Sequence, residues 1–138
     1  MDNSPILDSI CVDASALGNP GVTEYRAVDT RTGKVIFNHK LEQATNNIGE
    51  FLAVVHALAL YQKHNINLPI IYTDSVTAMA WVRNKKHKST LQPNEKTQPA
   101  IDLLNRGIDW LRTHTYTTKI LKWDTSNWGE IPADYGRK

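Results

Sequence analysis

The spacing of apolar residues changes at about residue 45, and this change constrains the fold more than any other feature of the sequence. Before it, short apolar segments alternate with turn-rich stretches, a pattern that predicts an antiparallel meander of strands. After it, a run rich in Ala, Leu and Val has no Gly or Pro beyond Gly49 and predicts a largely buried helix. The predicted strands are 10–12, 22–28 and 35–41, the turns are 17–21 and 29–33, and the helix is 47–63.

The second half of the chain alternates strand-like and helix-like segments. Strand 69–73 is reached from the third strand through a helix, which implies a right-handed crossover and parallel pairing. We therefore predict an α/β fold, a five-stranded mixed β-sheet flanked by helices in the order βββ-α-β-α-α-β-α, as one domain over residues 1–138. The other predicted elements are helix 75–83, loop 84–97, helix 99–112, strand 119–123 and a tail, 128–138, with room for one or two helical turns.

Charge, cysteine content and hydropathy narrow the class of protein. The net charge of +2 and the pI of about 8.7 are compatible with nucleic acid but do not demand it. Cys11 is the only cysteine, so an internal disulfide and a cysteine-rich zinc site are excluded. No apolar run approaches the roughly 20 residues that span a bilayer, and residues 1–5 lack the features of a secretion signal. We therefore expect a cytoplasmic monomer with no membrane partner.

Four carboxylates occur near the boundaries of predicted elements. Asp13 ends the first strand, Asp74 follows the fourth strand, Glu50 begins the main helix, and Asp134 lies in the tail. Each also has a structural interpretation. Asp13 could form a turn and Asp74 a helix N-cap. Glu50 could complete a capping box with Asn47, and Asp134 could be a solvated acid near a frayed terminus.

Taken together, these four acids indicate a divalent-cation site, which none of them indicates alone. If the first and fourth strands are neighbours, Asp13 and Asp74 project at one edge of the sheet, with the first turn of the main helix nearby. Carboxylates a few ångströms apart repel one another, and a divalent cation removes that conflict. Oxygen ligands select hard ions such as Mg²⁺ or Mn²⁺. Two ions about 4 Å apart could clamp a scissile phosphate, one activating water and one stabilising the leaving oxygen.

Three motifs occur in order along the chain: residues 12–21 (VDASALGNPG), 45–50 (TNNIGE) and 72–75 (YTDS). On these motifs the chain resembles the type 1 ribonucleases H. The resemblance implies an endoribonuclease that hydrolyses the RNA strand of RNA–DNA hybrids and leaves 5′-phosphate and 3′-hydroxyl ends. It also implies two Mg²⁺ ions, or Mn²⁺ in their place. The metal ligands and catalytic residues it implies are Asp13, Glu50, Asp74 and Asp134.

The resemblance further implies contacts with the hybrid. Asn19 resembles a residue that faces the minor groove; it is also a turn residue before Pro20, and both roles can hold together. Thr45, Asn46 and Asn47 resemble the segment that meets backbone and sugar groups ahead of the helix. Amides at a helix start attract phosphate, and Asn can read the 2′-hydroxyl that distinguishes RNA from DNA. For Asn47, helix capping is an equal alternative.

The sequence departs from the family pattern in the region where many members carry a basic protrusion. Here a loop replaces it, and its basic residues could contact phosphates or could form a solvated helix end. We therefore expect the protein to bind the hybrid more weakly than family members that carry the protrusion. These residues are Arg83, Lys85, Lys86, His87 and Lys88.

Two further departures concern the end of the chain. No histidine follows the fifth strand, where many members have one, and Asp124 or Glu130 could take its place as a proton carrier or outer-shell ligand, or be an ordinary loop acid. The closing helix is almost absent, so we expect Asp134 to be held by metal, by Pro132, and by the packing of Trp128 or Tyr135.

Two other functions remain open at this point. A catalytically silent hybrid-binding module would not need the repulsion of four acids. A DNA-processing nuclease of the same broad fold is less compatible with motifs 12–21 and 45–50, which fit a hybrid better.

Overall fold

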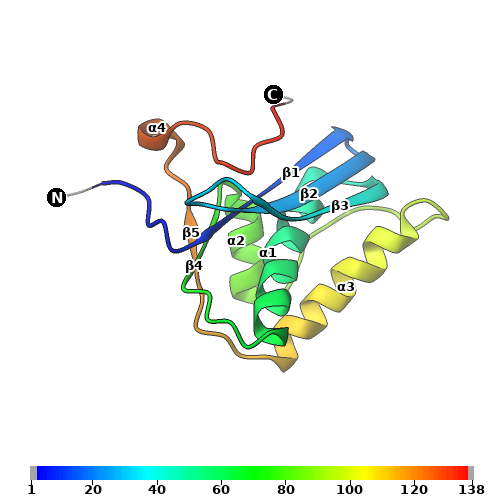
Figure 1. The fold of residues 1–138 in the computed structure, drawn as a ribbon. Coiled ribbons are helices and arrows are strands. Elements are labelled where there is room, and N and C mark those ends of the chain that lie inside the picture. Colours follow the sequence, from blue (N-terminus) through cyan, green and yellow to red (C-terminus); the bar gives the residue numbers. More distant parts are fainter. Residues whose placement is uncertain (1–2, 137–138) are drawn as a thin grey trace.

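The structure of the protein is a computed structural model that describes residues 3–136. A five-stranded mixed sheet forms its frame (Figure 1). The strand order is β3-β2-β1-β4-β5. The pairs β1–β2 and β2–β3 are antiparallel, and β1–β4 and β4–β5 are parallel. This confirms the predicted meander and the predicted parallel crossover. The strands are β1 (Ile10–Gly18), β2 (Gly21–Asp29), β3 (Val35–Ala44), β4 (Ile70–Thr73) and β5 (Lys119–Lys122).

Helices α1, α2 and α3 cover one face of the sheet, and the C-terminal segment crosses the other face (Figure 1). The order of elements is the predicted one, but the last helix was predicted in the wrong place. It precedes the tail instead of lying within it, and residues 129–136 contain no helix. Residues 137 and 138 of the predicted tail lie outside the described residues. The helices are α1 (Asn46–Lys63), α2 (Val76–Asn84), α3 (Gln98–Thr113) and α4 (Thr125–Trp128).

The two faces of the sheet bury separate apolar clusters. Successive residues of a strand point to opposite faces, so Val12 and Ala14 join the large core beneath the helices. Cys11 joins the smaller cluster beneath the tail, which also holds Tyr72 and Trp123. By the same alternation Asp13 lies on the face covered by the tail. In α3 the predicted apolar face is confirmed, because Leu104, Ile108 and Leu111 are buried.

Strand β1 is longer than predicted, so the prediction that Asp13 ends the strand was wrong. The strand continues to Gly18, and its last pair is Gly18 with Gly21 of β2. Only Asn19 and Pro20 form the turn between them. A Cβ on Gly21 would lie 2.3 Å from the carbonyl oxygen of Leu17, so only glycine fits this tight turn. Small residues after Asp13 carry little periodic signal, and cross-strand pairing with β2 keeps them extended.

Strand β3 also continues beyond its predicted end, to Ala44, because Ala44 still pairs with Gly21.

Among the described residues, no helix has the length and apolar character needed to cross a membrane.

Helix α1 lies close against the sheet at Gly49. A Cβ at this position would lie 2.8 Å from the Cβ of Ala14 and 2.9 Å from the Cγ2 of Thr23. These distances are shorter than real Cβ contacts allow. The absence of a side chain at Gly49 therefore sets how near the first turn of α1 lies to β1 and β2.

We predict that Gly49→Ala destabilises the protein by about 1–3 kcal/mol, the usual cost of overpacking a core. The sign is informative, because Ala is a better helix former than Gly by about 1 kcal/mol and would stabilise a helix that had room for it. Urea unfolding of the variant and the parent would measure the difference. A variant as stable as the parent would show that α1 can move away from the sheet at little cost.

Candidate metal centre and nucleic-acid contacts

Three carboxylates converge beside the central strand β1, just beyond its pairing with β4. Ligand oxygens of Asp13, Glu50 and Asp74 lie within 4.8 Å of one another. Asp13 and Glu50 are only 1% and 3% exposed, and Asp74 is half-buried. Opposite ligands of Mg²⁺ are separated by about 4.2 Å, which is twice a bond of about 2.1 Å. This donor set therefore fits a hard divalent cation after small adjustments of the side chains.

The convergence of Asp13 and Asp74 follows from the short pairing of β1 with β4. The pairing consists of Ile10 with Ile71 and Cys11 with Tyr72. Asp13 and Asp74 each follow the last pair by two residues, so strand alternation directs both carboxylates to the same face. Ser75 caps α2 through a hydrogen bond that its hydroxyl accepts from the Ala78 amide at 3.0 Å. The N-cap alternative for Asp74 was therefore wrong.

Glu50 reaches the centre from the first turns of α1. The predicted capping box with Asn47 was wrong, because the N-cap is Thr45, whose hydroxyl accepts a hydrogen bond from the Ile48 amide at 3.3 Å. Glu50 Oε1 instead accepts a hydrogen bond from the amide of Ala14 at 3.2 Å. This bond attaches the helix to β1 beyond the point where β4 stops pairing.

The surroundings of the Glu50 carboxyl disfavour its ionised form when no cation is bound. Burial raises the pKa of Glu50 far above its usual range, and the neighbouring carboxylates of Asp13 and Asp74 raise it further. The hydrogen bond from Ala14 opposes this shift only in part. In the absence of a cation, burial and the neighbouring carboxylates therefore favour the protonated form of Glu50, and a cation that binds must displace the proton.

We predict that Glu50→Gln flattens the pH dependence of stability in the presence of a chelator. The pKa of Glu50 is raised in the folded state, so between its unfolded pKa of roughly 4.3 and the raised value the folded state binds the extra proton. The free energy of unfolding therefore falls as pH rises, by at most about 1.4 kcal/mol per pH unit for one proton. Gln cannot ionise, so the variant lacks this contribution.

Urea unfolding from about pH 5 to about pH 8 would measure both slopes. Adding Mg²⁺ should restore stability to the parent at the upper end of that range and have less effect on the variant. Equal slopes for the two proteins would contradict the assignment.

Asp134, the fourth predicted ligand, lies outside the cluster of three carboxylates. It is half-buried in the tail, on the face of the sheet that carries Asp13. Its Oδ2 accepts a hydrogen bond from the Gly136 amide at 3.0 Å, and its carbonyl oxygen accepts one from Arg26 at 2.6 Å. The role of Asp134 as a ligand stays a prediction. Tyr135, one of the residues predicted to hold Asp134, contacts the sheet through Asn38. Arg26 also contacts this part of the tail, and the sequence analysis did not predict that contact.

Asp124 and Glu130, the predicted auxiliary acids, differ in their surroundings. Asp124 is the N-cap of α4, and its two oxygens accept hydrogen bonds from the amide and the side chain of Asn127 at 3.3 and 2.7 Å. Glu130 is exposed. Neither belongs to the carboxylate cluster. Asp124 has a structural role that accounts for its position, and an auxiliary role for either acid stays a prediction.

Three of the four predicted substrate contacts line one pocket of about 350 Å³. Asn19 comes from the β1–β2 turn, and Thr45 and Asn47 come from the start of α1. Lys88 lines the same pocket from the loop that follows α2. Asn46 is exposed but does not line it. The tertiary structure thus brings together groups from three separate segments that can bond to phosphate, sugar or base.

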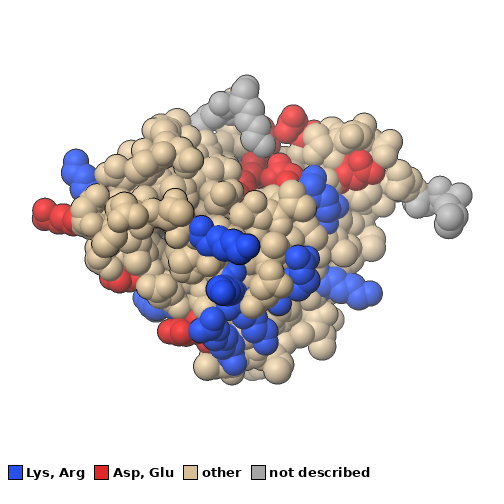
Figure 2. All heavy atoms as spheres, turned by 180° about the vertical axis from the view of Figure 1, so that it is seen from behind, with Lys and Arg blue, Asp and Glu red and all other residues tan. Residues whose placement is uncertain are grey.

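The region between α2 and α3 is a loop, as predicted, without helix or strand from residue 85 to residue 97. Arg83, Lys85, Lys86 and Lys88 are exposed, and three of them line a shallow pocket beside α2. Figure 2 shows Lys and Arg side chains gathered on one face of the molecule, below a group of acidic side chains. Positive charge of this kind attracts a nucleic-acid backbone.

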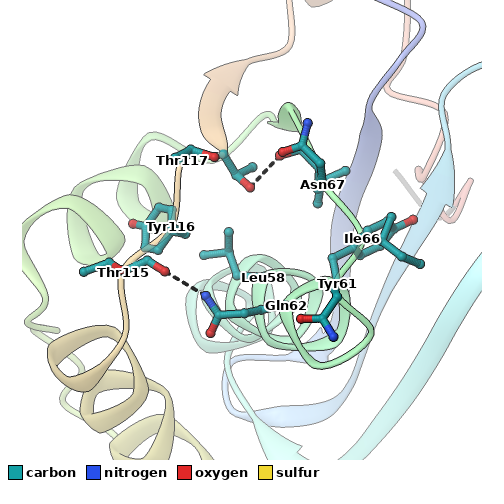
Figure 3. A pocket seen from close by; sticks show the side chains of 11 residues that line it. Leu58, Tyr61, Gln62, Ile66, Asn67, Thr115, Tyr116 and Thr117 are labelled. Atoms are coloured by element: carbon teal, nitrogen blue, oxygen red, sulfur yellow. Dashed lines mark hydrogen bonds between the residues drawn. The ribbon is translucent and has the colours of Figure 1, made fainter.

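Another pocket, of about 440 Å³, lies at the opposite end of β4 from the carboxylates (Figure 3). Its wall includes Gln62 of α1, whose side-chain amide donates a hydrogen bond to the Thr115 carbonyl at 2.7 Å. Its lining contains no carboxylate, imidazole, thiol or cationic side chain. The volume of this pocket therefore does not make it the metal site, because it offers no charged ligand for a divalent cation.

The sequence of this chain matches a known protein family. The RNase H family profile matches residues 8–129, a range that contains Asp13, Glu50 and Asp74 but ends before Asp134. The Ribonuclease H of Rickettsia bellii (strain RML369-C) is 33% identical over 136 residues, which cover 91% of this chain and 83% of that protein. The Ribonuclease HI of Rickettsia prowazekii (strain Madrid E) is 33% identical over 135 residues, covering 91% and 84%.

Solved structures show the same fold. The RNase H1 of the halophilic archaeon Halobacterium salinarum NRC-1 superimposes with a TM-score of 0.51 at 17% identity, covering 86% of each chain. LC11-RNase H1, solved in complex with an RNA/DNA hybrid, gives a TM-score of 0.53 at 17% identity, covering 83% of each chain. The match to the family profile, the identity to the rickettsial proteins and the shared fold lead to one conclusion: this chain belongs to the RNase H family.

Proposed function

We propose that this protein is a divalent-metal-dependent endoribonuclease that hydrolyses the RNA strand of RNA–DNA hybrids. The observation that carries the proposal is the cluster of Asp13, Glu50 and Asp74, which offers three carboxylate ligands within 4.8 Å in a family whose relatives are named Ribonuclease H. Mg²⁺ is the proposed ion because oxygen-only donors favour hard cations, with Mn²⁺ as a substitute.

In the proposed reaction, Asp13, Glu50 and Asp74 hold the ions, and Asp134 contributes from the tail. Bound there, two divalent cations supply Lewis-acid stabilisation of the charge that develops during in-line displacement at phosphorus. Glu50 would give up its proton if cations bound there, because burial and the neighbouring carboxylates raise its pKa in the empty site and the charge of the cations would offset both effects. The products proposed are a 5′-phosphate and a 3′-hydroxyl.

The hybrid is proposed to lie across the pocket formed by the β1–β2 turn and the start of α1. Asn19, Thr45 and Asn47 line this pocket, and Asn46 is exposed beside it. Carboxamide groups donate and accept hydrogen bonds, so they suit the 2′-hydroxyl of RNA. Lys88, which lines the same pocket, supplies positive charge for a phosphate.

A silent hybrid-binding module is disfavoured by the same carboxylates. Burying Asp13 and Glu50 together destabilises the fold, and binding alone gains nothing from that cost. A gel assay with end-labelled RNA tests the proposal in Mg²⁺, Mn²⁺ or chelator, with duplex RNA, duplex DNA and branched DNA beside the hybrid. We expect cleavage only of the hybrid RNA and only with metal. Cleavage of DNA, or binding of the hybrid without cleavage, would overturn the proposal in favour of one of the alternatives.

We predict that Asp13→Asn abolishes cleavage while the protein stays folded. Loss of a direct ligand should reduce kcat by more than the roughly 10–100-fold typical for outer-shell partners of a metal. Removal of one buried negative charge should leave the metal-free protein as stable as the parent or more so. Single-turnover cleavage and thermal unfolding in chelator measure the two effects. Asp109→Asn, at an exposed position of α3, is the matched control and should cleave normally. An active Asp13→Asn protein would refute the metal assignment.

We predict that Asn47→Ala raises KM for the hybrid several-fold and changes kcat little. One hydrogen bond to the substrate contributes about 0.5–1.5 kcal/mol, and Asn47 does not cap the helix, so the fold should not suffer. Steady-state cleavage of the hybrid measures the change. The matched control is Asn105→Ala, at an exposed position of α3. Equal KM values for the two variants would remove Asn47 from the proposed contacts.

A further inference from the structure

A row of three polar side chains crosses the sheet beside the carboxylate cluster. In the register of the sheet, Asp13 of β1 is opposite Arg26 of β2, and Arg26 is opposite Asn38 of β3. Directly opposed residues of antiparallel strands share one face and have Cβ atoms about 4.5–5.5 Å apart. For Asp13 this is the face that the C-terminal tail covers. The row therefore joins an acid of the cluster to two residues outside it.

The tail docks onto Arg26 and Asn38, the two members of this row that lie outside the carboxylate cluster. Arg26 Nε donates to the carbonyl oxygen of Ala133 at 2.8 Å, and Arg26 Nη2 donates to that of Asp134 at 2.6 Å. The guanidinium carbon also lies 4.4 Å from the centre of the Tyr135 ring. The Tyr135 hydroxyl donates to Asn38 Oδ1 at 2.6 Å. In Figure 1 the C-terminal segment crosses the strands on the side away from α1–α3, where these contacts lie.

These contacts matter because no helix fixes Asp134. Residues 129–136 have no regular secondary structure. Ile131 and Ala133 anchor the start of the segment in the apolar cluster beneath it. Beyond Ala133, the contacts of the tail with the sheet include the fork of Arg26 and the Tyr135–Asn38 hydrogen bond. The planar guanidinium can bond two carbonyls at once, which a lysine ammonium cannot do with the same fixed geometry.

We propose that Arg26 is a positioning residue of the active site: it holds residues 133–135 against the sheet and so sets where Asp134 stands relative to Asp13. The inference rests on the proposed function and concerns the fourth carboxylate of that site. Arg26 acts through the main chain of the tail, so it leaves the composition of the metal site unchanged. Its loss should lower kcat, because a displacement of about 1 Å can cost roughly a hundredfold, while KM for the hybrid stays nearly constant.

The test is a double-mutant cycle of Arg26→Ala and Asp134→Asn in the full chain. We expect Arg26→Ala to lower kcat about tenfold or more on its own and to have no further effect when Asp134 is already Asn. Arg26→Lys should recover part of the loss. Arg31→Ala, at an exposed position of the β2–β3 turn, is the matched control and should cleave like the parent. An equal loss in both backgrounds would overturn the proposal, since Arg26 would then act independently of Asp134.

Hydrogen exchange gives a readout that does not depend on activity. The Asp134 amide donates to the Ile131 carbonyl at 2.9 Å, and the Gly136 amide donates to Asp134 Oδ2 at 3.0 Å. We expect Arg26→Ala to speed exchange of the 131–136 segment and to leave α1 unchanged. Tyr135→Ala loosens the same docking from the tail side and serves if Arg26→Ala does not fold. Unchanged exchange in the tail would overturn the docking. A parent that leaves the hybrid intact would instead refute the proposed function, and exchange would still decide whether Arg26 docks the tail.

Discussion

Strand β1 pairs with β4 over just two residue pairs, and the site depends on where that pairing stops. The backbones of β1 and β4 pair as far as Cys11 and Tyr72. Beyond these residues the two strands no longer pair with each other, so their side chains and amides can take part in the site. Asp13 and Asp74 stand on the same face just past this point. The amide of Ala14, on the edge of β1 that β4 no longer occupies, binds Glu50 of α1. A longer β4 would have used that amide in the sheet ladder.

The carboxylates work against the stability of the fold, and the core around them compensates. Burial and mutual repulsion raise the pKa of Glu50, which shows that the unloaded site disfavours negative charge. The first turn of α1 nevertheless stays against the sheet, because Gly49 permits contact with Ala14 and Thr23. Phe51, Val54 and their neighbours on α1 bury apolar surface in the main core. Apolar burial therefore maintains an arrangement of charges that favours cation binding over the stability of the empty site.

Much of the fold was predictable because its signals are local. Turns between short apolar segments gave the meander, helical spacing gave the buried face of α3, and a strand reached through a helix gave the parallel pairing of β4. The errors occurred where local signals are weak. Ala14–Leu17 have no clear period, so the true length of β1 was missed. The N-cap of α1 is Thr45 because β3 continues to Ala44, and that length is set by pairing with Gly21.

The sequence by itself determined the order of the elements, the family resemblance and which acids could form a cation site, because each of these lies in a short motif or a periodic pattern. Tertiary structure decided which groups meet. It brought Asp13, Glu50 and Asp74 within 4.8 Å, and it placed Asn19 and Asn47 in the lining of one pocket. It also joined Arg26 to Ala133, residues 107 positions apart. The two-residue turn after Gly18 sets Arg26 opposite Asp13, but a contact with the tail has no local signature, because it depends on how the packed sheet and the chain end come together in space.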